Sequence, residues 1–309
     1  MLSRAEVARL LDPDSLLDAL AAAFEEVSAG RASVPPRVAA VTRHGWLGAM
    51  PGYVPGAGLG AKLVSAFPAN HELGLPSHMA LIALFDEEIG APLAVMDGTH
   101  ITTARTAAAS ALSARVLARP GARVLAVLGS GVQARAHMEA VGRVCPIEEI
   151  LVASRTPDHA QALAAGDPRA RATSFEEAVR AADVVCCCTH ADRPVLAFEW
   201  LRTGAHVTSV GFNARGPELD RETIVHGRLF VESLDAFEAP PAGAFELQDV
   251  DPGAATDLGA VLAGRAPGRR SPEEITVYKS VGHAAEDTTA AWLVYRRALS
   301  EGAGVRAAL

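Results

Sequence analysis

Residues 124–134 carry the pattern with the clearest chemical meaning. An apolar run leads into Gly129-Ser-Gly131-Val-Gln-Ala134, and a helical pattern follows. In such a turn Gly129 permits the tight bend, Gly131 lets a pyrophosphate approach the backbone, and Ala134 lets helix and strand pack closely. The free N–H groups at the helix start would face the phosphate charge. The pattern predicts a dinucleotide-binding site.

The end of the next strand bears on the choice of dinucleotide. It reads Ala153-Ser154-Arg155-Thr156, without the Asp or Glu that would accept a hydrogen bond from a ribose 2′-hydroxyl. Arg155, flanked by two hydroxyls, would attract a 2′-phosphate instead. The sequence therefore favours NADP(H), with NAD(H) as the alternative if Arg155 is only a solvated surface residue.

Three cations stand in uncharged surroundings in the first third of the chain. They are Arg37 after two prolines, Lys62 in an apolar run and Arg105 in an alanine-rich stretch. Burying such a charge is unfavourable unless it meets an anion. A substrate carboxylate would supply one. The alternative is that each cation pairs internally, with residues such as Asp97 or Glu72, or extends to solvent.

The elements around these residues fall into two patterns. Up to about residue 97 an amphipathic helical segment ending near Gly30 precedes short strands at 46–50, 61–66, 78–85 and 92–96, which indicates a small α+β unit. An alanine-rich helix is expected over 99–119. Alternating strands and helices then predict a doubly wound α/β, Rossmann-type domain, with strands at 124–128, 150–153, 184–188, 207–210, 229–231 and 275–278. The last predicted helix covers 287–299, and residues 240–270 give no clear pattern.

Composition excludes several classes of protein. The 309 residues are 50% hydrophobic with a net charge of −8, and no basic run suggests a nucleic acid or an anionic membrane surface as partner. Neither a secretory leader nor a membrane-spanning run is expected. Cys145 and the triplet 186–188 lack metal-ligand or disulfide spacing, so they are expected to be small buried residues and no metal is predicted. A reducing cytoplasm fits this usage.

Taken together, islands along nearly the whole chain resemble the ornithine cyclodeaminase/μ-crystallin family. The matching stretches are 58–70, Gly74-Leu-Pro-Ser77, Met96-Asp-Gly98, Thr102-x-x-Arg105-Thr-Ala-Ala108, 129–134, 182–189 and Lys279-Ser-Val-Gly282 leading to Asp287. The resemblance implies a substrate-binding and dimerisation domain over 1–119, to which 285–309 returns, and a Rossmann domain over 120–284. It also implies a homodimer that takes a small anionic amino or imino acid with NAD(P)H.

The resemblance assigns roles by position. Arg37, Lys62 and Arg105 match the residues that hold the substrate carboxylate. Lys62 is in addition expected to be catalytic, as the group that shuttles the proton. The implied cofactor contacts are Ser77, Thr106, Gly129, Gly131, Val132, Gln133, Ser154, Arg155, Thr156, Thr189, Val210 and Gly282.

One position departs from the family pattern. Asn213 stands where cyclodeaminases and alanine dehydrogenases carry an aspartate that acts as general acid/base, and the loop around it is one residue shorter. An amide cannot exchange a proton at neutral pH. Asn213 is therefore expected to hydrogen-bond an imine or the nicotinamide amide. Glu218 or Asp220, nearby in sequence, could replace the carboxylate only if the shortened loop turns it inward.

These observations favour an NADPH-dependent reductase of carboxylated, cyclic imines such as pyrroline-2-carboxylate. A protonated imine already carries its electrophilic charge and needs less general-base help than an amine. Two alternatives stay open. One is an amino-acid cyclodeaminase or alanine-type dehydrogenase. The other is a ligand-binding protein of the μ-crystallin type that retains NADPH with little turnover.

Overall fold

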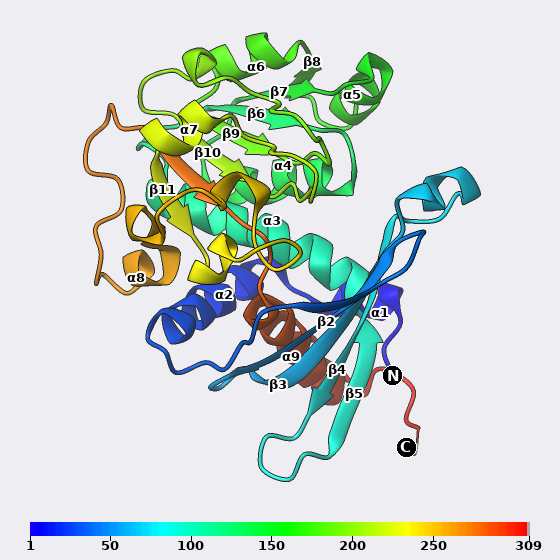
Figure 1. Ribbon diagram of the computed structural model, residues 1–309. Helices are drawn as coiled ribbons and strands as arrows, with labels where there is room; N and C mark the ends of the chain where they lie inside the picture. The colour runs from blue at the N-terminus through cyan, green and yellow to red at the C-terminus, as the bar shows by residue number, and fades with distance from the viewer. Residues whose placement is uncertain (308–309) are drawn as a thin grey trace. The chain divides into compact units, whose positions relative to one another are not determined.

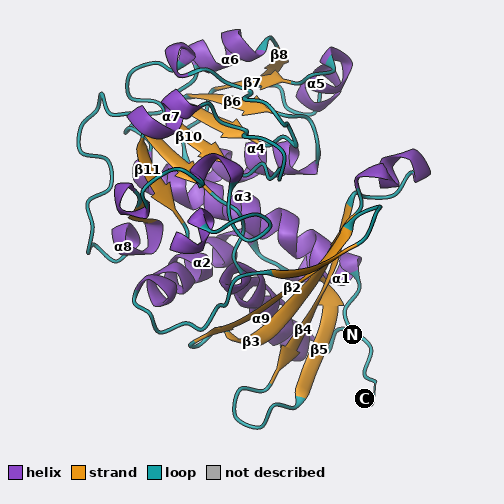
Figure 2. Cartoon of the chain, viewed as in Figure 1, coloured by secondary structure: helices purple, strands orange, loops and turns teal. Residues whose placement is uncertain are grey.

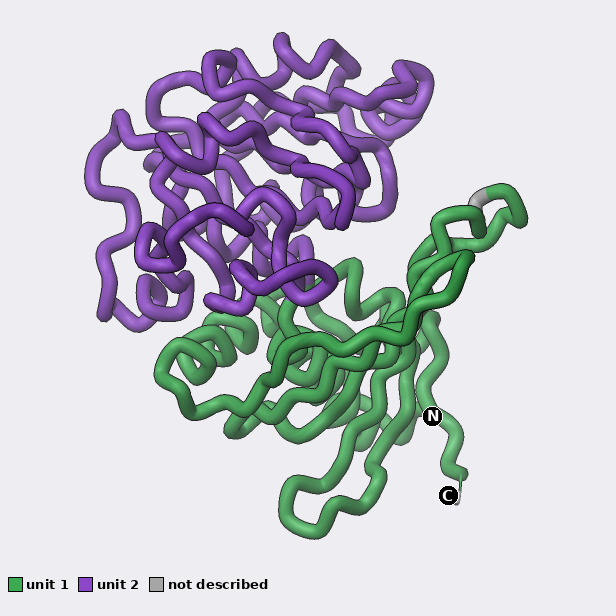
Figure 3. Tube along the Cα trace, viewed as in Figure 1, with its two compact units in different colours: residues 1–105, 283–309 green, residues 106–282 purple. Residues whose placement is uncertain are grey.

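The structure is a computed structural model that describes residues 1–307 and, His71 excepted, their side chains. The chain forms two compact units, one of residues Met1–Arg105 and His283–Leu309 and the other of residues Thr106–Gly282 (Figure 3). The sequence placed the two domain boundaries at 119/120 and 284/285. In the structure the first boundary lies between Arg105 and Thr106, within the continuous helix Gly98–Leu117. The two units are described separately below.

Unit 1 combines helices with an antiparallel sheet. Its elements are α1 (Arg4–Leu10), α2 (Pro13–Ser28), β1 (Val38–Val41), β2 (Trp46–Val54), β3 (Gly58–Ala66), β4 (His78–Phe85), β5 (Pro92–Asp97), the first part of α3 (Gly98–Leu117), and α9 (Ala284–Glu301). The expected N-terminal helical segment is two helices. Ser3 and Glu6 form a capping box on α1, and Asp12 caps α2, whose first residue is Pro13.

The five strands form a meander in the order β1-β2-β3-β4-β5, each antiparallel to the next. Alternation along β3 turns Lys62, Val64 and Ala66 to the covered face and Leu63 to the open face. Helix α9 packs across β2, β3 and β4 on the covered face, and α2 packs against α9 (Figure 1). The last helix of the chain therefore completes the core of the first unit.

Three glycines of the sheet allow α9 to approach closely. A Cβ on Gly52 would lie 3.2 Å from that of Ala284, one on Gly60 would lie 3.5 Å from the hydroxyl of Thr288, and one on Gly58 would lie 3.0 Å from the ring of Trp292. The three helix residues recur every four positions and so share one face of α9. The bare backbone of the sheet thus determines how near the first turns of α9 lie to Lys62.

Unit 2 is the predicted α/β domain. Besides the rest of α3 it contains β6 (Val124–Leu128), α4 (Val132–Val144), β7 (Glu149–Ala153), α5 (Pro157–Ala164), β8 (Ala170–Ala172), α6 (Phe175–Ala181), β9 (Val184–Cys187), β10 (His206–Ser209), α7 (Arg221–His226), β11 (Arg228–Val231), β12 (Thr256–Asp257), α8 (Leu258–Leu262) and β13 (Thr276–Lys279). Strands β8 and β12, and β1 of unit 1, had no clear sequence pattern. The unreadable stretch 240–270 contains β12 and α8.

Every pairing in the second sheet is parallel, in the order β12-β11-β13-β10-β9-β6-β7-β8. Figure 2 distinguishes the strands of this sheet from the helices around them. From β6 the chain first moves outward through β7 and β8, then returns to the other side of β6 as β9. This reversal is the topological switch point of a doubly wound sheet, where ligands bind beyond the carboxyl ends of the strands. The fold class predicted from the sequence is confirmed.

The central strands β9, β10 and β13 are short and fully buried, as expected for a parallel sheet covered by helices on both faces. Cys186 and Cys187 belong to this core, as expected for small apolar residues, and burial raises the pKa of the Cys186 thiol. Among residues 1–307, no helix combines the length and the hydrophobicity needed to cross a membrane.

Candidate active site

A buried cluster of charges lies on the covered face of the unit 1 sheet. The Lys62 ammonium and the Asp287 carboxylate form an ion pair of 2.6 Å between Nζ and Oδ2. The Arg105 guanidinium donates from Nε to Asp287 Oδ1 and from Nη1 to Glu286 Oε2, at 3.1 Å each. Lys62 is 2% exposed, Arg105 4% and Asp287 1%, so these charges are almost fully removed from water.

Local structure explains how the two carboxylates reach the cations. Glu286 and Asp287 lie in the first turn of α9, where the helix dipole favours negative charge. His283 caps this helix, and its backbone N–H donates to Glu286 Oε1 at 2.7 Å. One Glu286 oxygen thus fixes the helix start while the other receives Arg105. The predicted helix began only at residue 287, so the sequence did not place Glu286 within it.

Burial and charge act in opposite directions on this cluster. Burial lowers the pKa of Lys62 to about 8, against the attraction of Asp287, and the positive charges of Arg105 and Arg37 lower it as well. Burial alone would raise the pKa of Asp287, but Arg105 and Lys62 hold it below its ordinary value. Near neutral pH the site therefore contains a charged carboxylate beside an amine that can release its proton.

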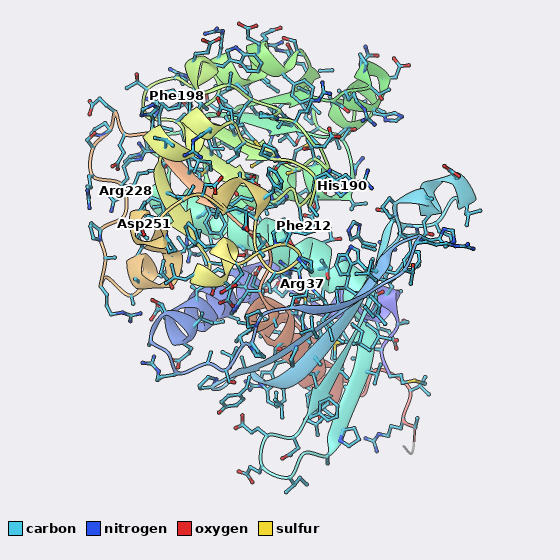
Figure 4. The ribbon with its side chains drawn as sticks, in the orientation of Figure 1. Arg37, His190, Phe198, Phe212, Arg228 and Asp251 are labelled. Carbon is cyan, nitrogen blue, oxygen red and sulfur yellow. The ribbon has the colours of Figure 1, made fainter. Side chains whose placement is uncertain are left out.

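Arg37 completes the predicted cation trio. It lies half-buried on the segment leading into β1, with its guanidinium 6.0 Å from the centre of the Trp46 ring (Figure 4). Its charge acts on Lys62, so the three cations predicted to act together influence one region of unit 1. Arg37 thus adds a third positive charge to the region that holds the carboxylates of Glu286 and Asp287.

The internal pairing considered from the sequence does occur, but with other partners. Asp97 accepts the backbone N–H of His100 at 2.8 Å, and Glu72 is exposed. Asp97 and Glu72 were therefore wrong as partners of Lys62 and Arg105. The correct partners come from α9, almost at the other end of the chain. Asp287 ended the last matched sequence stretch, but nothing in that stretch indicated a charge partner.

The glycine loop of unit 2 has the geometry that its sequence predicts. Gly129 ends β6 with φ +124°, and a Cβ there would lie 2.5 Å from the carbonyl oxygen of Cys188, on the neighbouring strand connection. Only glycine suits that position. At Gly131, in contrast, a Cβ would meet no atom within 4 Å. The backbone of Gly131 does not itself require glycine. What the missing side chain leaves there is open space beside the loop.

This open space lies at the start of a long helix. Gly131 is the N-cap of α4 and offers no side chain to the free N–H groups of the first turn. The buried Gln133 Oε1 has no hydrogen-bond partner among the described residues. Val132 is 67% exposed beside the loop, and Ala134 is fully buried under it. These features fit the phosphates of a dinucleotide.

The stretch Ser154-Arg155-Thr156 follows β7, the strand next to β6. Ser154 Oγ lies 2.9 Å from Ser130 Oγ, which joins this stretch to the glycine loop. Arg155 is exposed and forms no ion pair within residues 1–307. It lies where the sequence placed it, with no acidic residue in the stretch.

Other predicted contact residues follow strands of the same sheet. Thr189, Val210 and Gly282 come after β9, β10 and β13, so their backbones gather at the edge that holds the glycine loop. The amide and hydroxyl of Thr189 donate to Glu218 Oε1, and the amide of Gly282 donates to Glu232. Buried carboxylates thus fix the loops at this edge.

The positions around Asn213 do not supply a replacement acid/base. Glu218 does turn inward, but it accepts from Thr189 and from Ser209 Oγ and Gly211 N, at 2.7 Å each for the latter two. Asp220 caps α7 and also accepts the amide of Phe198. Both carboxylates therefore serve the fold of unit 2.

Asn213 itself braces a turn. Its Nδ2 donates to the carbonyl of His190 at 3.3 Å, and its Oδ1 accepts the amide of Arg215 at 2.9 Å. His190 and Phe212, labelled in Figure 4, mark the two loops that this contact joins. The catalytic role assigned to Asn213 stays a prediction.

The two remaining predicted contacts lie in or next to unit 1. Ser77 is exposed at the start of β4, with its Oγ 3.1 Å from His78 Nδ1. Thr106 is 8% exposed and follows Arg105 on α3. Their assignment to the cofactor also stays a prediction.

A doubly wound dinucleotide-binding fold, together with an antiparallel sheet that carries buried cations, is typical of nicotinamide-dependent oxidoreductases. Residues 1–302 match the ornithine cyclodeaminase/mu-crystallin family, and the chain belongs to that family.

Three comparisons illustrate the likeness. The chain is 39% identical to ketimine reductase mu-crystallin of Mus musculus, over 95% of this chain and 96% of the mouse protein. It matches Thermococcus litoralis Δ1-pyrroline-2-carboxylate reductase, solved with NADH and L-proline, with a TM-score of 0.93 and 35% identity over 99% of each chain. An archaeal alanine dehydrogenase dimer with bound NAD matches with a TM-score of 0.89 and 33% identity, over 98% of this chain and 97% of that one.

Proposed function

We propose that the protein is a nicotinamide-dependent reductase of carboxylated imines, with a cyclic ketimine such as pyrroline-2-carboxylate as its substrate. The enzyme class is an oxidoreductase acting on C=N or CH–NH bonds. The observation that carries the proposal is the buried cluster of Lys62, Arg105 and Asp287, on which the positive charge of Arg37 also acts. The mouse and Thermococcus relatives, named for imine reduction, support it.

The cations account for recognition of the carboxylate. Arg105 and Lys62 are held rigidly and out of water, so an incoming carboxylate meets donors that need little reorganisation. A substrate carboxylate is the kind of anion that such a group of cations would attract. Arg37, stacked on Trp46, contributes a second guanidinium near the sheet edge. Binding through the carboxylate fixes the position of the adjacent C=N carbon.

Lys62 also supplies a proton. With a pKa of about 8, its ammonium remains charged at neutral pH yet gives up a proton far more readily than an ordinary lysine. It can therefore keep the imine nitrogen protonated while the carboxylate is held. The bound NAD(P)H would supply the hydride. Gly129, Gly131, Val132 and Gln133 would hold its phosphates.

NADP(H) is the proposed preference. Arg155, between the hydroxyls of Ser154 and Thr156, supplies a cation for a 2′-phosphate, and no carboxylate in this stretch competes for it. The Thermococcus and alanine dehydrogenase structures hold NADH and NAD, so NAD(H) is the alternative.

A homodimer is part of the proposal. Side chains on the open face of the unit 1 sheet are apolar and at least 39% exposed, and neighbouring strands bring them together: Leu47, Leu63, Met79 and Leu81. A second copy would cover this face, in line with the dimeric relative. Sedimentation should show a dimer for the wild type and a monomer for Leu63→Asp. A Leu63→Asp protein that stays dimeric would exclude this face as the interface.

A second candidate is alanine dehydrogenase or cyclodeaminase activity, favoured by the name of the archaeal relative. Two contacts weigh against it. Glu218 accepts hydrogen bonds from Ser209 and Gly211, and Asp220 caps α7, so both carboxylates that could replace the missing aspartate have other roles. The third candidate, a ligand-binding protein with little turnover, would not require a lysine able to exchange a proton.

A substrate panel tests the choice. The purified protein is mixed with NADPH or NADH and with cyclic or acyclic imino acids, while ammonia release is measured from ornithine, lysine and alanine with NAD(P). Imine-dependent oxidation of NADPH is expected. Ammonia release without imine reduction would overturn the proposal in favour of the second candidate. Cofactor binding without any turnover would favour the third.

A further inference from the structure

We infer that Asp287 is a positioning residue for the proposed reaction: its carboxylate keeps the Lys62 ammonium protonated and holds it beside the Arg105 guanidinium. The inference rests on the proposed function, since it concerns how Lys62 performs there. The sequence alone assigned no role to Asp287.

Lysine use in this chain singles out position 62. Of the 28 basic residues only Lys62 and Lys279 are lysines, and the other 26 are arginines. Both lysines are buried and paired, Lys62 with Asp287 at 2.6 Å and Lys279 with Glu246 at 3.0 Å. A chain that otherwise uses arginine for positive charge keeps a compact, ionisable ammonium at these two buried positions.

The geometry of Asp287 differs from that of Glu286. The two oxygens of Asp287 meet different cations, Oδ1 facing Arg105 and Oδ2 facing Lys62. Glu286 binds Arg105 and the start of its own helix. Within residues 1–307, Asp287 is therefore the carboxylate that joins the two cations and the one in ion-pair contact with Lys62.

The surrounding charges make the protonation of Lys62 depend on its contact with Asp287. Lys62 of β3 is faced by Asp287 from α9, by Arg105 from α3 and by Arg37 from the segment before β1, while Glu286 faces Arg105. Burial and both arginines favour the neutral amine, and Asp287 favours the ammonium. Removing the charge of Asp287 should therefore make Lys62 lose its proton at a lower pH.

The small number of lysines permits a direct measurement. Protein grown with lysine labelled with ¹³C at Cε should give two lysine signals, and Lys62→Met assigns them. Titration of the apoprotein should give a Lys62 midpoint at its pKa of about 8. In Asp287→Asn this midpoint should move to lower pH. Glu286→Gln, the matched control, should move it less, and the Lys279 signal should be the same in all three proteins.

Kinetics supply the second readout. In Asp287→Asn the alkaline fall in kcat/KM for the imine should begin at lower pH, so the variant should lose about tenfold more activity at pH 8.5 than at pH 6 for each unit by which the midpoint moves. Partial rescue at acid pH would not follow from a general loss of structure. Glu286→Gln should weaken binding through Arg105, seen in KM, and should move the alkaline limb less than Asp287→Asn does.

The outcomes separate the inference from the proposed function. An unchanged Lys62 midpoint in Asp287→Asn, or a rate loss that is uniform in pH, would overturn the inference even in an active imine reductase. If the wild type reduces no imine, the proposed function fails. The titration then still decides whether Asp287 controls Lys62.

Discussion

The Nζ atom of Lys62 lies 2.6 Å from Oδ2 of Asp287, although one residue comes from β3 and the other from the last helix. The same carboxylate binds Arg105 through its other oxygen. The three side chains are nearly inaccessible to water, so each depends on the others for its charge.

Replacing Arg105 by lysine should impair substrate binding. The ammonium keeps the charge but lacks the planar fork with which a guanidinium can bind a substrate carboxylate while it also holds Glu286 and Asp287. Losing one charge-assisted hydrogen bond corresponds to about 1.5–3 kcal/mol, so kcat/KM should fall roughly tenfold to a hundredfold, mainly through KM. Steady-state kinetics with the imine varied give this number. Unchanged NADPH affinity by fluorescence is the control, and an unchanged KM would contradict the assignment.

The two glycines of the dinucleotide loop should respond differently to alanine. Gly129→Ala introduces a Cβ 2.5 Å from a backbone oxygen at a φ of +124°, and should lower the free energy of unfolding by about 2–4 kcal/mol. Gly131→Ala places its methyl group in open space and should fold like the wild type. It should nevertheless bind NADPH at least about tenfold more weakly, because the methyl occupies room needed by the phosphates.

Thermal unfolding of the apoproteins and fluorescence titration with NADPH separate these two effects. A Gly131→Ala protein with normal stability and normal NADPH affinity would place the phosphates elsewhere.

Arg155→Ala should change the preference between cofactors. Loss of a charge-assisted contact to the 2′-phosphate should raise the Kd for NADPH by about tenfold or more, while the Kd for NADH changes by less than about twofold. The matched control is Arg180→Ala, which removes an exposed arginine that pairs with Glu176 on α6. Equal effects of Arg155→Ala on both cofactors would indicate that NADP(H) is not selected at this position.

Glu218→Gln should act on stability. The buried carboxylate accepts hydrogen bonds from Thr189, Ser209 and Gly211, and an amide offers one oxygen fewer. We expect a loss of about 2–3 kcal/mol in the free energy of unfolding, measured with denaturant. Because Glu218 exchanges no proton in the account above, the shape of the pH–rate profile should stay that of the wild type. A lost limb in that profile would make Glu218 the missing acid/base.

Local patterns allowed the sequence to predict most of the Rossmann-type unit. Apolar runs such as 124–128 and 184–188 correspond to strands buried on both faces, and the glycine loop lies where its spacing implied. The same holds for the helix over 99–119, found as Gly98–Leu117. Strand β8, three residues with alternating arginine and alanine, has too short a pattern to be recognised.

The partners of the cations could not be predicted in the same way. The cations themselves stood out because their neighbours are uncharged, but Glu286 and Asp287 lie beyond the entire Rossmann unit in the chain. Asp287 reaches Lys62, and Glu286 reaches Arg105. Both contacts form because α9 returns to the first sheet and packs on the bare backbone of Gly52, Gly58 and Gly60. The packing of α9 on this sheet is a tertiary contact, and no local pattern in the sequence near Lys62 predicts it.

The most direct measurement compares two substrates that differ only in the carboxylate. Purified protein with NADPH is given Δ1-pyrroline-2-carboxylate or 1-pyrroline, the same ring without the acid group, and oxidation of NADPH is followed. The account predicts a preference for the acid of about a hundredfold or more in kcat/KM, because two buried cations and Arg37 face the carboxylate. Equal rates for the two rings, or no oxidation with the acid, would contradict it.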